Sequence, residues 1–292
     1  MHRSWRARYL LTSAALGMVL AAALAGCGPR NNEAQAPASA PSVAGPGVPA
    51  GAEGLAGVEW VRVPAPGGTL TAAVARPAGD GPFPVLVILH GTHGFAREYV
   101  RLAQDVARAS GVIAVAGCWF EGGQGAGRQF VTPIACPDAP EMPAAASDEA
   151  LQIVGALVTA VRDLRGVRGD RIALFGHSRG GGAALHYVFE RGGVWVAVLN
   201  STGYPQEVID RAGAVSAPLL LLHGKADSPA DGGSERTAVD QARKFEGALR
   251  RKEKPVKAVY FDGGHNGLFA DAKQYDESVR LIAAFLREYL AK

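Results

Sequence analysis

The stretch RIALFGHSRGGGAAL, residues 171–185, decides the fold of this chain. Its first five residues form a largely apolar run that predicts a buried strand. Its last residues are small, and they predict a helix that packs closely against that strand. Between them, GHSRG at residues 176–180 matches the pattern G-x-S-x-G, in which a serine occupies a sharp, strained turn between a strand and a helix. The stretch therefore predicts a strand, a tight turn that carries Ser178, and a helix.

Outward from this turn, apolar runs alternate with segments of helical period. The run at residues 84–90 shows no alternation of apolar and polar residues, which is typical of a strand covered on both faces. The alternation predicts an α/β fold with a mostly parallel sheet and helices on both faces. The predicted strands are residues 58–63, 69–76, 84–90, 112–116, 171–175, 194–199, 218–222 and 256–261. The predicted helices are residues 99–109, 148–164, 180–190, 235–250 and 276–290.

A serine hydroxyl is a weak nucleophile until a base takes its proton, and the base needs a carboxylate to orient it. Two later predicted strands run into such residues, because HGKAD ends in Asp227 and DGGHNG contains His265. The carboxyl ends of parallel strands meet at one edge of the sheet, where open α/β sheets bind their ligands. We therefore expect Ser178, Asp227 and His265 to meet there. Asp231, four residues after Asp227, is the alternative acid.

On these motifs, nearly all of residues 58–292 resembles the α/β-hydrolase superfamily, whose chain order is serine, acid, histidine. Within it, the chain is similar to dienelactone-hydrolase-like and related small serine esterases. These share an HG turn after the third strand, an H-G-x-x-D acid loop and a GH loop that carries the base. Dienelactone hydrolases proper have a cysteine where this chain has Ser178, so the resemblance implies ester hydrolysis in general. The string GHSRGG also resembles chlorophyllases and acetylhydrolases of the platelet-activating-factor type.

The resemblance implies a serine carboxylesterase that acts on a small-molecule ester without a cofactor. It also implies an oxyanion hole made by the backbone N–H groups of Arg179 and of Thr92, in the turn HGTHG at residues 90–94. An acyl-peptidase or a lipase using the same residues is one alternative, and a non-catalytic lipoprotein that binds a ligand is another. Large side chains near the predicted edge could wall the substrate pocket or belong to the core. They are His93, Phe95, Trp119 and Tyr204.

One long segment, residues 117–146, is rich in Gly and Pro and has no helical or strand period. Loops of this length in a compact domain are usually functional or disordered. Because it follows the carboxyl end of a predicted strand, we expect it to lie over the site.

The N-terminal residues are typical of an export signal. Three Arg precede an uncharged run at residues 9–25, and LAGC at residues 24–27 resembles a bacterial lipobox. This implies a signal peptide over residues 1–26, a lipidated Cys27 and a membrane-anchored protein of the bacterial cell envelope; an ordinary signal peptide with an incidental cysteine is the alternative. By resemblance to known sorting signals, Gly28 implies the outer membrane. Residues 27–57, rich in Ala, Pro and Gly, read as a flexible tether before a catalytic domain at residues 58–292.

The amino-acid composition limits the classes of partner that this protein is expected to bind. The net charge is +3, and residues 1–26 hold three of the 30 Lys and Arg, so the rest carries 27 basic and 27 acidic residues. With no basic block, this balance argues against nucleic acid as a partner. No C-x-x-C or H-E-x-x-H motif indicates a metal site. The sequence carries no signal for the oligomeric state.

Lipidation of Cys27 would leave Cys118 and Cys136 as the remaining cysteines. In an oxidising compartment these form a disulfide if their Cα atoms come close enough. Two buried thiols are the alternative.

Overall fold

The structure, a computed structural model, describes residues 47–290. The predicted signal peptide, Cys27 and the first part of the predicted tether lie outside the described residues. The described strands are β1 Val58–Ala65, β2 Gly68–Ala75, β3 Phe83–Leu89, β4 Ile113–Gly117, β5 Val167–His177, β6 Val196–Asn200, β7 Leu219–Gly224 and β8 Val256–Phe261. The described helices are α1 Arg97–Ser110, α2 Asp148–Ala160, α3 Arg179–Glu190, α4 Gln206–Asp210, α5 Val239–Arg251, α6 Gly267–Ala270 and α7 Ala272–Leu290.

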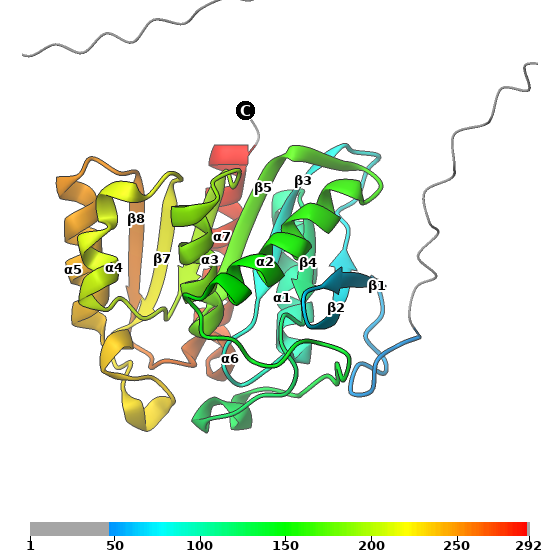
Figure 1. Ribbon diagram of the computed structural model, residues 1–292, viewed down its shortest axis with the longest axis horizontal. Coiled ribbons are helices and arrows are strands. Elements are labelled where there is room, and N and C mark those ends of the chain that lie inside the picture. The colour runs from blue at the N-terminus through cyan, green and yellow to red at the C-terminus, as the bar shows by residue number, and fades with distance from the viewer. Residues whose placement is uncertain (1–46, 291–292) are drawn as a thin grey trace, which may run out of the picture. The chain divides into compact units, whose positions relative to one another are not determined.

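These strands form one sheet in the order β1-β2-β4-β3-β5-β6-β7-β8 (Figure 1). β1 and β2 make an antiparallel hairpin, and β2 also pairs antiparallel with β4. From β4 to β8 every neighbouring pair is parallel. The predicted α/β fold with a mostly parallel sheet is confirmed.

Helices cover the sheet on both faces. Side chains of α2, α3 and α5 pack in one apolar cluster, and those of α1 and α7 pack in the other. β3 shows why its sequence lacks alternation, since Val85 and Val87 point into the first cluster while Leu86 and Ile88 point into the second. A strand with apolar neighbours on both faces needs apolar side chains at every position, so its sequence does not alternate between apolar and polar residues.

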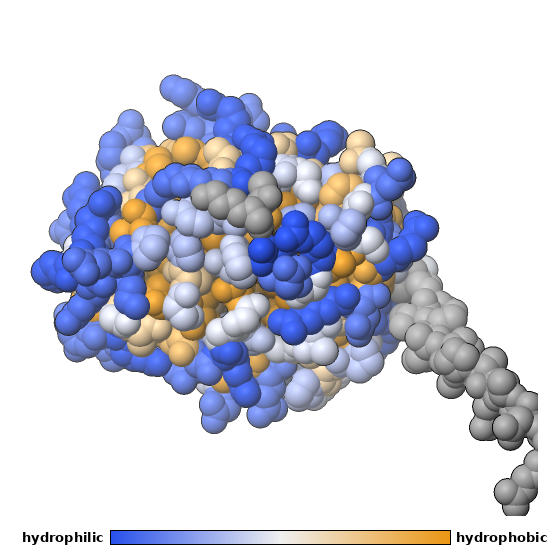
Figure 2. Space-filling model, turned by 90° about the horizontal axis from the view of Figure 1, so that it is seen from above, coloured by the Kyte–Doolittle hydropathy of each residue, from blue (hydrophilic) through white to orange (hydrophobic). Residues whose placement is uncertain are grey.

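The parallel strands place their following loops along one edge. β5 ends at His177, β7 at Gly224 and β8 at Phe261, and the segments after them gather along the lower edge in Figure 1. The long segment after β4 lies along the same edge. Figure 2 looks onto the opposite edge, where hydrophilic side chains are interspersed with smaller apolar areas. The two edges thus differ, because only the lower one carries the long loops.

Some expectations are corrected. Residues 47–57 fall within the predicted tether, yet Ala52 is fully buried and Arg97 donates hydrogen bonds to the carbonyls of Gly51 and Glu53. Small residues let this segment lie close to the rest of the domain, and hydrogen bonds from Arg97 and from the N–H of Ala135 to its backbone carbonyls hold it there. The helices α4 and α6 were not predicted, because five and four residues are too few to show a helical period. No helix among residues 47–290 is long and apolar enough to cross a membrane.

Candidate active site

Ser178 lies in the sharp turn that the sequence predicts. Its backbone has φ 51° and ψ −114°, in a region that non-glycine residues rarely adopt, and α3 begins at the next residue. Its N–H donates to the carbonyl of Asn200 at 2.9 Å, which holds the turn against β6. A Cβ at Gly176 would lie 2.2 Å from the carbonyl oxygen of Gly180, and a Cβ at Gly180 would lie 2.4 Å from that of Leu89. The turn therefore requires glycine at both positions.

The side chains of Ser178, His265 and Asp227 form one hydrogen-bonded series. His265 Nδ1 lies 2.8 Å from Asp227 Oδ2, and His265 Nε2 lies 2.9 Å from Ser178 Oγ. A carboxylate only accepts hydrogen bonds, so Nδ1 carries a proton, and in that tautomer Nε2 can accept from the serine hydroxyl. Asp227 and His265 are both buried, at 6% and 3% exposure. The ends of β5, β7 and β8 thus bring together residues that are far apart along the chain.

Further contacts hold the carboxylate of Asp227. Its Oδ1 accepts from the hydroxyl of Thr237 at 2.8 Å, and its Oδ2 lies 3.3 Å from Nε2 of His223. Burial raises the pKa of Asp227, but hydrogen bonds from His223 and His265 outweigh it and hold that pKa below its usual range. The carboxylate is therefore ionised at neutral pH. Sequence reasoning missed Thr237, since nothing in its local pattern marks it.

Asp231, the alternative acid, does not contact the imidazole. Its carbonyl accepts from Nδ2 of Asn266 at 2.7 Å, and its Oδ2 lies 3.4 Å from the backbone nitrogen of Asn266. It supports the loop that carries His265, while Asp227 faces the ring.

The turn after β3 lies directly against Ser178. A Cβ at Gly91 would lie 3.4 Å from the Cβ of Ser178. Thr92 and Arg179 both line the cavity beside Ser178, and Arg179 Nε donates to Thr92 Oγ1 at 3.2 Å. Arg179 Nη1 donates to the carbonyl of Pro143 at 2.6 Å. One guanidinium thus joins the two segments whose backbone N–H groups are predicted to form the oxyanion hole.

Buried side chains hold the turn after β3, residues 90–94, in position. The N–H of Gly91 donates to Tyr99 Oη at 2.9 Å, and the hydroxyl of Tyr99 lies 2.6 Å from His93 Nε2, to which it can donate. Burial lowers the pKa of His93 to about 4, which leaves a neutral ring able to accept that bond. Trp119 donates from its backbone to His90 Nε2 at 3.2 Å and from its indole to the His90 carbonyl at 3.0 Å. Burial lowers the pKa of His90 to about 3.

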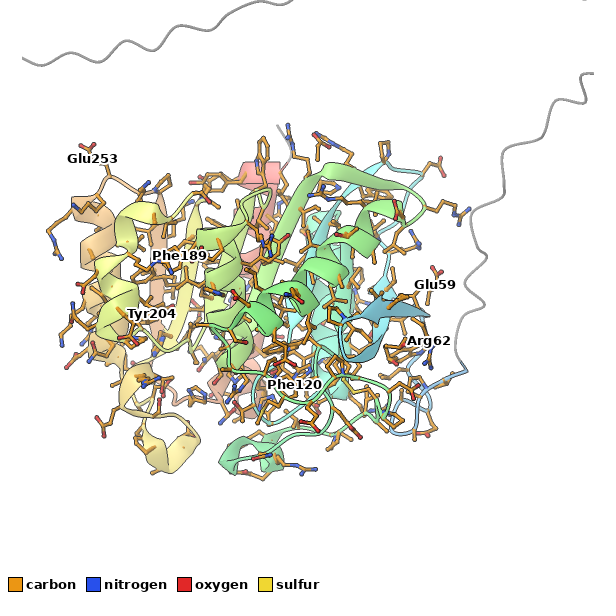
Figure 3. All side chains as sticks on the ribbon, in the orientation of Figure 1. Glu59, Arg62, Phe120, Phe189, Tyr204 and Glu253 are labelled. Carbon is orange, nitrogen blue, oxygen red and sulfur yellow. A yellow bond between two sulfur atoms is a disulfide. The ribbon has the colours of Figure 1, made fainter. Side chains whose placement is uncertain are left out.

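A cavity of about 560 Å³ opens beside Ser178, and the predicted pocket residues do not line it. His93 and Phe95 border a separate hollow of about 420 Å³. Trp119 and Tyr204 are fully buried in the core, and Figure 3 labels Tyr204 among the side chains there. Of the two alternatives for these four residues, pocket wall or core, the structure places none of them in the cavity beside Ser178 and buries all four.

The segment after β4 is closed by a bond between Cys118 and Cys136, whose Cα atoms are 6.6 Å apart. Of the two alternatives for these cysteines, the structure has the disulfide. Within the closed loop, Gln124 N–H donates to the carbonyl of Thr92 at 2.8 Å. The loop thus lies against the turn beside Ser178.

Within residues 47–290, no group of His, Cys, Asp or Glu is arranged to hold a metal ion. The side chains around Ser178 include an imidazole 2.9 Å from its hydroxyl and an ionised carboxylate beside that imidazole, a set that can perform acyl transfer.

Solved structures resemble the chain across most of its length. An esterase of Pyrococcus furiosus shares 14% identity at a TM-score of 0.62, with 80% of this chain and 93% of that chain covered. An esterase of the archaeon Pyrobaculum calidifontis shares 18% identity at a TM-score of 0.57, covering 79% and 83%. EstE1, a carboxylesterase from a metagenomic library, shares 18% identity at a TM-score of 0.58, covering 80% and 90%. At these identities the similarity shows the fold.

No curated protein matches the sequence. A family model does match, over residues 70–284, and its description is "Dienelactone hydrolase family". The matched residues span β2 to α7 and include Ser178, Asp227 and His265. The chain therefore belongs to the dienelactone hydrolase family.

Proposed function

We propose that this protein hydrolyses carboxylic esters through an acyl-enzyme intermediate formed on Ser178. The observation that carries the proposal is the series of hydrogen bonds from Ser178 Oγ to His265 and from His265 to Asp227. Membership of the dienelactone hydrolase family supports ester hydrolysis in general.

His265 acts as the base in the first step. Its Nε2 takes the hydroxyl proton while Ser178 Oγ attacks the ester carbonyl carbon, and a tetrahedral oxyanion forms. The carbon–oxygen bond to the alcohol then breaks, and His265 returns the proton to the departing alcohol oxygen. Water attacks the acyl-enzyme by the same route and releases the acid and the free serine. The ionised carboxylate of Asp227 orients the ring and stabilises its charged form.

The oxyanion requires donors that are in place before the reaction. The backbone N–H groups of Thr92 and Arg179 lie on two segments that border Ser178 and are joined by the Arg179 guanidinium. In this role each donor would contribute about 10² to 10³ in rate. Because the donors belong to the main chain, the braces behind the turn set their position.

The test is the variant Ser178→Ala with p-nitrophenyl acetate as substrate. We expect hydrolysis to fall to near the uncatalysed rate, and a fluorophosphonate probe to label the wild-type protein but not the variant. Ser110→Ala is the matched control, because Ser110 lies at the end of α1 and donates to the carbonyl of Val106. Wild-type turnover by Ser178→Ala would end the proposal.

We further propose that the protein is a lipid-anchored component of the bacterial cell envelope. The motif LAGC at residues 24–27, after a basic and then an apolar stretch, supports this. Replacement of Cys27 by Ala is expected to move the protein from the membrane fraction to the soluble fraction. Equal membrane association of both forms would contradict a lipid anchor at Cys27.

A further inference from the structure

One face of α3 lines the cavity beside Ser178. Gly182, His186 and Phe189 follow Ser178 at spacings of four, four and three residues, so they share that face, and all of them line the cavity. At about 1.5 Å per residue, this face extends about 16 Å from Ser178 to Phe189. Figure 3 labels Phe189 on α3, well above the loops of the lower edge. The cavity is therefore a groove that leads away from the nucleophile along a helix.

The walls of this groove are largely apolar. Besides Phe189, they include Leu185, Val208 and the methyl groups of residues 144–146. The charge of Arg211 is paired, because its guanidinium lies over the ring of Phe189 at 4.4 Å and binds the carboxylate of Glu190 at 2.6 Å. Burial lowers the pKa of His186, so its ring is neutral at neutral pH. The exposed rim carries opposite charges, on Glu207 and Arg236.

The position of the groove decides which half of an ester it receives. The departing alcohol takes its proton from His265 and therefore lies on the side of the imidazole. The groove is bordered by Thr92, Ser178 and Arg179, and His265 is not among its lining residues. The acyl half therefore extends into it.

We propose that the groove along α3 binds an unbranched aliphatic acyl chain that extends from Ser178 toward Phe189, an inference that rests on the proposed ester hydrolysis. Gly182 lies one helical turn from Ser178, where the segment after β4 meets α3. A Cβ at Gly182 would lie 3.1 Å from the Cβ of Ala145, which is closer than carbon atoms normally pack. Glycine at this position lets the segment after β4 pack against α3, and both line the groove, so a methyl group here would displace Ala145 and alter the wall of the groove.

The experiment compares Gly182→Ala with wild type on p-nitrophenyl acetate, butyrate, octanoate and decanoate. The wild type is expected to gain up to about fourfold in kcat/KM for each methylene that the groove buries. In the variant, the ratio of octanoate to acetate kcat/KM is expected to fall by about tenfold or more, as for one added methyl group in a hydrophobic pocket. Circular dichroism checks folding, and alanine favours a helix over glycine.

Gly155→Ala is the matched control. Gly155 also lies within a helix, α2, and a Cβ there would make an ordinary contact of 3.7 Å with Tyr187. Its acyl-length profile should equal that of the wild type. Phe189→Ala provides the opposite change, because it lengthens the groove and should move the preference toward longer acyl chains.

A second series of esters separates the two halves of the substrate. Ethyl octanoate carries the long chain on the acyl side, and octyl acetate carries it on the alcohol side. Gly182→Ala is expected to slow only the first. An unchanged octanoate to acetate ratio, or a loss confined to octyl acetate, would overturn the groove assignment while Ser178-dependent hydrolysis of acetate continued. Loss of the proposed function has a different signature, namely acetate hydrolysis that does not depend on Ser178.

Discussion

Two loops border Ser178, and they contribute in different ways. The loop after β7, residues 225–238, supplies side chains, since Asp227 binds His265 and Thr237 binds Asp227. The loop after β4, residues 118–146, contributes mainly through its main chain. Its residue Gln124 donates to the carbonyl of Thr92, and the carbonyl of Pro143 accepts from Arg179. One loop thus carries side chains that hold His265, while the other holds the turn of Thr92, one of the two proposed oxyanion donors.

This comparison implies that substitutions in the two loops have different signatures. Removal of a functional group from the β7 loop should reduce kcat and leave the fold intact. Release of the β4 loop should reduce stability first. Of the four changes that follow, three lie in these loops and test this division, and one, at His93, lies in the turn after β3; they run from the largest expected effect to the smallest.

Asp227→Asn is expected to have the largest effect. An amide at this position can donate to His265 Nδ1 and so favours the wrong tautomer, in which Nε2 cannot accept from Ser178. The expected loss in kcat is about 10⁴-fold, with the thermal midpoint near that of the wild type. Asp231→Asn is the matched control, since Asp231 contacts Asn266 and not the imidazole. An equal loss in both variants would show that the β7 loop acts as a scaffold and would contradict the assignment of Asp227.

Removal of the disulfide by Cys118→Ser and Cys136→Ser tests the β4 loop. The bond joins residues 18 apart, and closing a loop of this size stabilises the folded state by about 3 kcal/mol through the unfolded chain. Urea unfolding should show a loss of this size in the double variant, and in wild type treated with a reductant. The reductant should leave the double variant unchanged. Full stability combined with lost activity would mean that the two loops do not divide their roles as described.

The histidines beneath the β4 loop give the fold a dependence on pH. An unfolded histidine takes a proton below its ordinary pKa of 6.5, whereas burial lowers the pKa of His93 to about 4 in the folded state. Between these values only the unfolded state binds the proton, so stability falls as the pH falls. The lowered pKa of Asp227 acts in the same direction in more acid solution, where the stabilisation by its carboxylate is lost. Urea unfolding at several pH values should show a flatter slope for His93→Gln. An unchanged slope would show that His93 does not contribute to the pH dependence of stability.

Thr237→Val is expected to have the smallest of these effects. It removes the hydroxyl that donates to Asp227 Oδ1 and keeps a side chain of similar shape. A hydrogen bond to a charged group contributes about 1.5 to 3 kcal/mol, and solvent or His223 can replace part of it, so kcat should fall by about tenfold. The acid side of the pH–rate profile should move as well, because the carboxylate would be less stabilised. A loss as large as that of Asp227→Asn would mean that the whole loop has moved.

Much of the fold could be predicted because its signals are local. An apolar run on a doubly covered strand, such as residues 85–89, and a glycine-flanked serine each reflect contacts made at that position. Asp227 and His265 could be found because each follows a strand end, and parallel strands bring such ends to one edge.

The pocket could not be predicted in the same way. The sequence leaves Trp119 as either pocket wall or core, and in the structure it is buried and donates to His90, because a side chain after a strand can turn inward or outward without any change in its local sequence. The true lining includes Gly182 and Ala145, small residues that matter for the space they leave. Their role depends on how the segment after β4 crosses α3, which no periodicity records. The packing of residues 50–57 against the domain could not be predicted for the same reason, because no sequence periodicity records it.

The unusual backbone of Ser178 implies a conflict between durability and reactivity at one residue. A non-glycine residue at φ 51° and ψ −114° is strained by roughly 1 to 3 kcal/mol, and glycine would relax it. Glycine would therefore be the least strained residue at this position, but it has no hydroxyl group that could react. A serine at this position is therefore kept at a cost to stability, which is understandable only if its hydroxyl is needed for the proposed chemistry.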